Sequence, residues 1–212
     1  GAPPRRPADR RRAATPQPYA GKLHTVAALI RALEQALAVQ ALPVGVGHPG
    51  SISPRTGLMR NANTTQLNGR PFDRDLAEAL GRPVACANDA NCFALSEAVD
   101  GAGAGARSVF GVILGTGVGG GLVIEGKLHA GQDGNAGEWG HAGLPWPDSE
   151  EVPGPACKCG LSGCIEAWCS GPGLSADHAR RTGERLSGEA IAAKAVDGDD
   201  RAAASLERHA CR

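Results

Sequence analysis

The sequence contains the run Cys157-Lys-Cys-Gly-Leu-Ser-Gly-Cys-Ile-Glu166, which follows the tetrad Glu138-Trp-Gly-His141. Three cysteines in a Cys-x-Cys-x4-Cys array on a glycine-rich loop, with one histidine upstream, supply the ligands of a closed tetrahedral zinc site. We therefore predict a zinc knuckle over residues 141–164, with a chance cluster or a redox pair as the alternatives. Its ligands are expected to be His141, Cys157, Cys159 and Cys164.

The composition narrows the class of protein. Seven cysteines are an odd number, and no secretory signal peptide opens the chain, so reduced thiols in the cytoplasm are expected. Basic and acidic residues number 22 each, which gives no indication of a nucleic-acid or membrane partner, and no apolar run approaches the ~20 residues of a membrane helix. Among the six histidines only His141 lies in a motif. Polar, helix-like contexts predict surface positions for His24, His178 and His209.

Three regions follow one another along the chain. Residues 1–18 hold five prolines and five arginines without apolar periodicity, and are expected to form a disordered arm. Residues 19–105 are expected to form the remainder of an N-terminal α/β domain. Residues 106–212 are expected to form a partial C-terminal α/β domain that contains the zinc knuckle.

Helical and strand patterns alternate after the arm, which favours an α/β fold with a mixed sheet. The predicted helices cover residues 23–40, 74–80 and 89–99, with helical patterns again from residue 173. The predicted strands cover residues 42–47, 84–87, 108–114 and 122–124, the last two joined by a glycine turn over residues 115–121.

Two short motifs could carry chemistry. Asn88 and Asp89 stand where a predicted strand ends and a helix begins, which is where α/β sheets place groups that contact ligands. Asp89 could equally be an N-cap of that helix. The tight loop Gly115-Thr116-Gly117 could hold phosphate with its backbone N–H groups and the Thr hydroxyl, although it is not a Walker P-loop.

These motifs occur together in the order seen in one family. They are Gly47-His-Pro-Gly-Ser-Ile-Ser-Pro54, Asn88-Asp-Ala-Asn-Cys92, Leu114-Gly-Thr-Gly-Val-Gly-Gly-Gly121, Gly137-Glu-Trp-Gly-His141 and the cysteine loop. From about Ala14 to Arg212 the chain resembles the ROK-family sugar kinases. Its closest resemblance is to bacterial fructokinases and the related N-acetylglucosamine kinases.

The resemblance implies an actin-like ATPase (ribonuclease H-like) fold of two domains, with the sugar bound between them. Asp89 matches the family's general base, which accepts the proton of the attacking hydroxyl as it approaches the γ-phosphate. Gly115, Thr116 and Gly117 would contact ATP, which acts with Mg2+. The zinc would be structural, with one ring nitrogen of His141 on the metal and the other facing the sugar. The residues that would hold the sugar are Gly50, Asn88, Glu138, His141 and Glu166.

The chain departs from the family pattern at both ends. The family's Asp-x-Gly-Gly-Thr loop, which wraps the ATP phosphates, does not occur in these 212 residues, and neither does a late glycine-rich turn that contacts adenosine. The resemblance is therefore to a kinase truncated at both ends, with a nearly whole sugar site and an incomplete nucleotide site. Such a chain is expected to be weakly active or inactive.

The leading hypothesis is ATP-dependent phosphorylation of a hexose, fructose being the expected one, at a terminal hydroxyl. The alternative is a non-catalytic, zinc-stabilised sugar-binding or regulatory protein. A ROK-type repressor is disfavoured because about twenty irregular residues cannot form the winged helix that precedes the sugar domain in such repressors. The expected partners are a hexose and ATP, without nucleic acid or membrane. Because dimers are frequent in the family, a homodimer is also expected.

Overall fold

The computed structural model describes residues 8–212, and the chain folds into two compact units. The first unit comprises Gly1–Val109 and Leu122–Ala136, and the second comprises Phe110–Gly121 and Gly137–Arg212. Residues 122–136 thus pack with the first unit, whereas the sequence analysis placed them in the C-terminal domain. The predicted division into domains itself stays a prediction.

The predicted disordered arm over residues 1–18 lies partly outside the described residues. Residues 8–18 contain neither helix nor strand. No helix within residues 8–212 is both long enough and apolar enough to span a bilayer.

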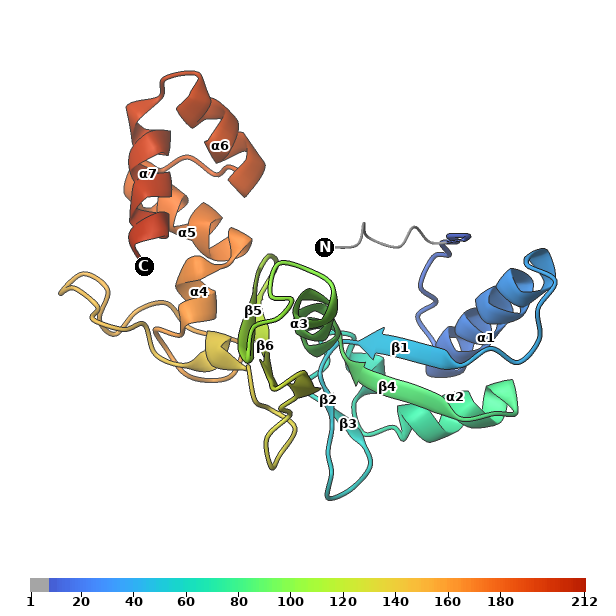
Figure 1. Ribbon diagram of the computed structural model, residues 1–212. Helices are drawn as coiled ribbons and strands as arrows, with labels where there is room; N and C mark the ends of the chain where they lie inside the picture. Colours follow the sequence, from blue (N-terminus) through green and yellow to red (C-terminus); the bar gives the residue numbers. More distant parts are fainter. Residues whose placement is uncertain (1–7) are drawn as a thin grey trace. The chain divides into compact units, whose positions relative to one another are not determined.

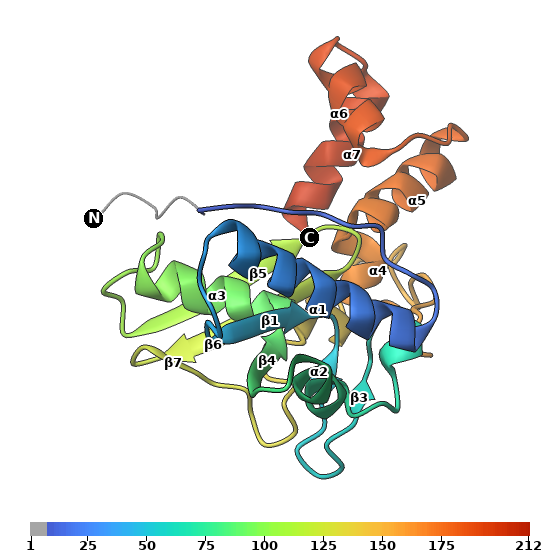
Figure 2. The ribbon, with the colours of Figure 1, turned by 90° about the vertical axis from the view of Figure 1, so that its right-hand side faces the viewer.

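Two helices cover one face of a parallel strand pair in the first unit (Figures 1 and 2). Helices α1 (Tyr19–Ala36) and α2 (Phe72–Leu80) pack on each other and against strands β1 (Val44–His48) and β4 (Val84–Asn88). Leu76 is fully buried at the centre of this core. Burying each such side chain contributes about 1.5–3 kcal/mol, so this core is a main source of the unit's stability.

The opposite face of the strand pair carries helix α3 (Asp89–Val99). Side chains alternate along a strand, so Val46 points into the α1–α2 core and Gly47 lies against α3. A Cβ on Gly47 would stand 3.6 Å from the sulfur of Cys92 and 3.8 Å from the Cα of Asp89. The first unit therefore has the helix–sheet–helix layers of an α/β fold.

Three short elements connect β1 to α2. Strands β2 (Ser51–Ile52) and β3 (Met59–Arg60) pair antiparallel, and the 3-10 helix η1 (Thr65–Leu67) follows them. A second sheet has the order β5 (Ser108–Leu114), β6 (Val118–Ile124) and β7 (Lys127–Leu128). The glycine turn between β5 and β6 is shorter than predicted, because β6 already begins at Val118.

The second unit has two apolar clusters. Trp168, only 1% exposed, packs with Val118, Leu144 and Ile165, and Trp139 covers part of this cluster. The second cluster joins the last three helices. Figure 1 shows these helices gathered at the C-terminal end of the chain. The helical elements of this unit are η2 (Trp139–His141), α4 (Ile165–Cys169), α5 (Gly171–Thr182), α6 (Gly188–Val196) and α7 (Asp200–Cys211).

A buried carboxylate joins α5 to α7 and to the C-terminal residue Arg212. Asp177 on α5 is 1% exposed and accepts hydrogen bonds from Arg208 Nε at 3.2 Å and from Arg180 and Arg212. Burial opposes ionisation of Asp177, but the hydrogen bonds and charges of Arg212, Arg208 and Arg180 outweigh it and hold the pKa of this carboxyl below its usual value. The guanidinium groups of Arg180 and Arg212 also lie 4.8 and 4.3 Å from the ring centre of Trp168.

Two further predictions from the sequence need correction, one in the bounds of a helix and one in the burial of a histidine. The predicted helix over residues 23–40 is instead Tyr19–Ala36, since Ala38 and Ala41 adopt positive φ angles of 52° that end helical geometry. His178, expected at the surface, is 1% exposed, and its Nδ1 lies 2.9 Å from the hydroxyl of Ser205.

Candidate functional site

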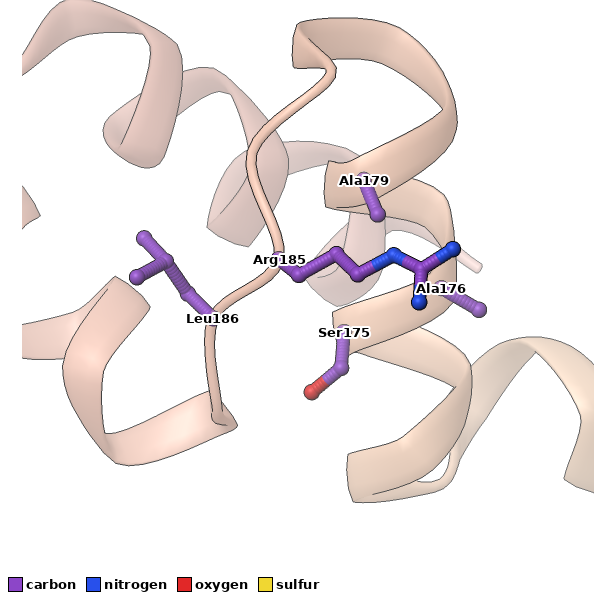
Figure 3. A pocket seen from close by; sticks show the side chains of 5 residues that line it. All are labelled: Ser175, Ala176, Ala179, Arg185 and Leu186. Carbon is purple, nitrogen blue, oxygen red and sulfur yellow. The ribbon is translucent and has the colours of Figure 1, made fainter.

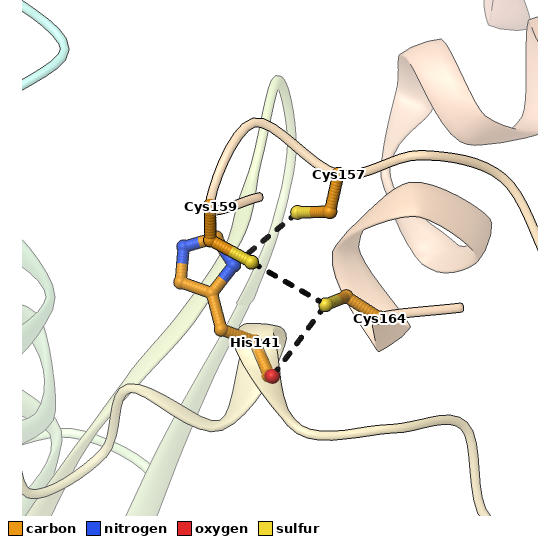
Figure 4. A group of neighbouring side chains, drawn as sticks. All are labelled: His141, Cys157, Cys159 and Cys164. Carbon is orange, nitrogen blue, oxygen red and sulfur yellow. Dashed lines mark hydrogen bonds between the residues drawn. The ribbon is translucent and has the colours of Figure 1, made fainter. Parts of the chain in front are cut away.

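The structure brings the four predicted metal ligands together (Figure 4). The ligand atoms of His141, Cys157, Cys159 and Cys164 all lie within 4.8 Å of one another. The sulfur of Cys157 is 3.5 Å from His141 Nδ1, and the sulfurs of Cys159 and Cys164 are 3.6 Å apart. Zinc bonds to sulfur and nitrogen at a tetrahedral angle would give S···N and S···S separations of about 3.5 and 3.8 Å. The donor set and its spacing therefore fit a tetrahedral zinc ion, with Nδ1 as the ligand atom of His141.

Backbone pairing builds the segment that carries these four ligands, residues 141–164, which we call the metal loop. The N–H of Cys157 donates to the carbonyl of Leu161 at 2.7 Å, and short bridges join Ala156 to Ser162 and Gly143 to Cys164. A glycine is required at position 163, where φ is +73° and a Cβ would come within 2.9 Å of the carbonyl oxygen of Pro153. The loop conformation thus arises from the backbone and its glycines as well as from the ligands.

The two neighbouring thiols of the cluster differ in acidity. Burial raises the pKa of the Cys164 thiol to about 12, and the sulfur of Cys159 adds to this shift. A backbone hydrogen bond from Leu161 lowers the pKa of the exposed Cys159 thiol. Because metals bind thiolates, a cation in this cluster would have to displace the Cys164 proton, and its charge would stabilise the buried sulfur.

The carboxyl end of β4 holds Asn88 and Asp89. Asn88 is the N-cap of α3, since its Oδ1 accepts the N–H of Asn91 at 3.1 Å, and its Nδ2 donates to the carbonyl of Gly50 at 2.9 Å. The alternative that Asp89 caps the helix is therefore wrong. Asp89 is instead the first residue of α3, is exposed, and accepts the N–H of Ala90 through Oδ1. Asn88 thus fixes the Gly50 turn beside the residue that the family resemblance identifies as the base.

A network that the sequence analysis missed holds the turn after Gly50. The side-chain oxygen of Asn135 accepts hydrogen bonds from Ser51 Oγ at 3.3 Å and from Arg60 Nη2 at 3.2 Å. Arg60 Nε also donates to Ser51 Oγ. Nothing in the sequence pattern pointed to these residues, because the contacts join positions up to 84 residues apart.

The Gly115–Gly117 turn is packed against the first turn of α4. The N–H of Gly115 donates to the carbonyl of Gly117, and the carbonyl of Gly115 accepts the N–H of Gly171. Glu166 Oε2 accepts the N–H of Val118 at 3.0 Å. A Cβ on Gly117 would stand 2.6 Å from the same oxygen, so only glycine lets the carboxylate approach this closely.

The turn that carries Glu138 and His141 packs on β6. The indole N–H of Trp139 donates to the carbonyl of Gly119 at 2.8 Å. A Cβ on Gly140 would overlap the carbonyl oxygen of Val118, which explains the glycine in this motif. Glu138 is exposed and His141 is half-buried.

The predicted site residues divide between the two units. Gly50, Asn88 and Asp89 are neighbours in the first unit, and the remaining predicted residues lie in the second. The structure also adds Lys158, whose Nζ is 3.0 Å from Glu166 Oε1. The roles assigned to all of these residues stay predictions.

An open pocket of about 490 Å³ lies elsewhere in the second unit (Figure 3). It is lined by Ser175, Ala176 and Ala179 of α5 and by Arg185 and Leu186. None of these residues belongs to the motifs identified in the sequence, so the pocket adds nothing to the candidate site.

The layered α/β fold and the glycine and cysteine motifs define a known class of proteins. The model of the ROK family matches residues 6–212, and the chain belongs to this family.

Individual relatives agree with this assignment. An N-acetyl-D-glucosamine kinase of Pasteurella multocida is 39% identical over 194 residues, which cover 89% of this chain and 64% of the relative. The ROK hexokinase structure from Thermus thermophilus superposes with a TM-score of 0.80 at 32% identity, over 93% of this chain and 64% of that one. A ROK glucokinase from Streptomyces griseus, solved with glucose and AMPPNP, gives a TM-score of 0.71 at 28% identity, with coverage of 93% and 66%.

These comparisons confirm the predicted fold class, an α/β protein of the actin-like ATPase (ribonuclease H-like) type. They do not support the more specific resemblance to fructokinases, since curated relatives such as the P. multocida protein are N-acetylglucosamine kinases. This chain spans slightly under two thirds of the length of the P. multocida relative.

Proposed function

We propose that this chain acts in the ATP-dependent phosphorylation of an N-acetylated hexosamine at a terminal hydroxyl. The observation that carries the proposal is the position of Asp89, exposed in the first turn of α3 while Asn88 does the capping. The names of the curated relatives support the choice of an N-acetylated sugar over the fructose expected from the sequence.

In the proposed reaction, Asp89 accepts the proton of the sugar hydroxyl as its oxygen attacks the γ-phosphate of ATP. Asn88 holds the backbone of Gly50 in place, so that a carbonyl and a carboxylate stand at fixed positions beside the sugar. The N–H of Gly115 is bonded to the Gly117 carbonyl, so the turn would offer the N–H groups of Thr116 and Gly117 and the Thr116 hydroxyl to the phosphates. Mg2+ bound to ATP would neutralise charge on the transferring phosphoryl group.

The metal loop has a separate role in this proposal. A zinc ion held by His141 and the three cysteines would be structural, because four protein ligands leave no open position for a substrate. With Nδ1 directed at the cluster, Nε2 of His141 is the nitrogen available to a sugar hydroxyl. Glu166 and Glu138 supply further carboxylates for the sugar hydroxyls.

A non-catalytic sugar-binding protein remains the second candidate. It would use the same sugar-contacting residues, with Asp89 accepting a hydrogen bond from the sugar without acting as a base. Sugar binding depends on hydroxyl contacts, whereas phosphoryl transfer depends on clamping the phosphates and Mg2+, so the two candidates differ in turnover and not in affinity.

The test measures binding and turnover on one preparation. Titration calorimetry with N-acetylglucosamine, N-acetylgalactosamine, glucose and fructose is run beside an ADP-release assay. Asp89→Asn should lower any turnover by about 10²–10⁴-fold while sugar affinity is retained. Asp100→Asn, an exposed aspartate at the other end of α3, is the matched control and should change neither quantity.

Each outcome has a defined meaning. Turnover in Asp89→Asn equal to that of the unchanged chain would overturn the role of Asp89. A preference for fructose would overturn the substrate class. Sugar binding without ADP release would favour the non-catalytic candidate.

A further inference from the structure

The two oxygens of Glu166 hold two different segments of the second unit. Oε2 accepts the N–H of Val118, directly after the Gly115–Gly117 turn, and Oε1 forms an ion pair with Lys158 at 3.0 Å. Lys158 stands between Cys157 and Cys159, two of the predicted metal ligands. One carboxylate therefore connects the metal loop to the turn.

Burial and packing leave this carboxylate little freedom. The side chain of Glu166 is 12% exposed, and Val118, whose N–H it accepts, is 5% exposed. Gly117 provides the space that Oε2 occupies. A shift of the carboxylate would therefore break the hydrogen bond to Val118 or bring the oxygen against the turn.

Lys158 itself is 65% exposed, and an exposed ion pair usually contributes little to stability, partly because ordering a long side chain costs entropy. Metal ligands on both sides of Lys158 would reduce that cost, because they fix the backbone from which the side chain extends. The ion pair should then be stronger when the loop holds a metal than when it does not.

We propose that Lys158 is a positioning residue that couples the metal loop to Glu166 and, through Glu166, to the Gly115–Gly117 turn. When the loop binds zinc, Lys158 holds Glu166 in the orientation that accepts the Val118 N–H. The contacts and the coupling stand independently of the proposed function. Only the assumption that the Gly115–Gly117 turn holds the ATP phosphates rests on it.

The amide of Val118 gives a direct readout. Its hydrogen-exchange rate is measured by NMR in the zinc-loaded chain and in three variants. Lys158→Ala should speed exchange about three- to tenfold, and Lys158→Arg should restore the slow rate, because a guanidinium can also pair with Glu166. Lys194→Ala, which removes a lysine of the same unit that pairs with Glu184 at 2.6 Å, is the matched control and should leave Val118 unchanged.

Chelation supplies the second half of the test. Removing zinc from the unchanged chain should speed Val118 exchange to a similar extent, and chelating Lys158→Ala should add little further. Additive effects would show that metal and lysine act separately and would overturn the coupling. An unchanged Val118 rate in Lys158→Ala, or loss of bound zinc in that variant, would also overturn it.

Failure of this inference can be distinguished from failure of the proposed function. If calorimetry finds no sugar binding in the unchanged chain, the proposed function fails, yet the Val118 amide still decides the role of Lys158. If sugar binds and Val118 does not respond, only the coupling fails.

Discussion

Replacing Gly117 by alanine should disrupt the contact between α4 and the Gly115–Gly117 turn. The new Cβ would stand 2.6 Å from Glu166 Oε2, below the 3.0 Å that real Cβ contacts respect, so the carboxylate must recede by at least about 0.4 Å. Its bond to the Val118 N–H, now 3.0 Å, would lengthen beyond the range of about 2.7–3.2 Å for such bonds. Gly117 does not have a positive φ, so backbone strain adds nothing to the effect.

The size of the effect follows from that one bond. A hydrogen bond to a charged group contributes about 1.5–3 kcal/mol, and the Val118 N–H would be left buried without its acceptor. Loss of a glycine lowers the entropy of the unfolded chain and returns about 0.4–1 kcal/mol. We therefore expect Gly117→Ala to destabilise the second unit by about 1–2 kcal/mol.

Urea unfolding followed by tryptophan fluorescence measures this change. All three tryptophans, at positions 139, 146 and 168, lie in the second unit, so the signal reports on it alone. Gly119→Ala is the matched control, because its new Cβ would meet no atom within 4 Å. This variant should leave the free energy of unfolding unchanged or slightly raised. Equal midpoints for the two variants would refute the argument from Glu166.

Three further predictions concern other parts of the chain. Asp177→Asn should lower the free energy of unfolding by about 3 kcal/mol in the same assay, since it removes a buried charge that holds several arginines. Because the pKa of Asp177 lies below its usual value of 3.8, its contribution to stability is present above about pH 4 and is lost as the pH falls through the lowered pKa. The stability of the variant should therefore depend less on acid pH, and identical pH profiles would contradict this. Cys164→Ser should reduce zinc well below one per chain by metal analysis while Cys211→Ser keeps it; equal zinc content in both would count against the metal loop. Burial raises the pKa of Cys86 to about 11, so iodoacetamide at pH 8 should modify the exposed Cys211 faster than Cys86, as followed by mass spectrometry. Equal rates for the two thiols would contradict this.

Local signals in the sequence were sufficient where the local chain determines the structure. Helix α3 begins and ends where predicted, at Asp89 and Val99, because Asn88 is a strong cap at the end of a short strand. The four metal-loop residues converge as predicted because glycines and short spacings leave the loop few other conformations. Asn88 directly precedes α3, and the three cysteines lie within eight positions, whereas His141 joins them from 16 residues before Cys157.

Tertiary contacts decided what the sequence could not predict. His178 looks like a polar surface residue of a helix, but packing of α5 against α7 buries it beside Ser205. The ion pair between Lys158 and Glu166 has no sequence signature either, because it depends on where α4 places the carboxylate. The alternative that Asp89 caps α3 was wrong by one position. Asn88, which directly precedes it and caps equally well, is the N-cap.

The backbone pairing of the metal loop has a consequence for metal choice. Cys164 lies in a bridge with Gly143, and the N–H of Cys157 is fixed on Leu161, so backbone pairing helps to hold the four ligand atoms within 4.8 Å of one another. A hard ion such as Mg2+ requires six oxygen ligands in octahedral geometry and finds neither in a set of three sulfurs and one imidazole. Under the proposed function, magnesium nucleotide is always present as the substrate. A zinc ion in the metal loop would then face no competition from the ion that accompanies that substrate.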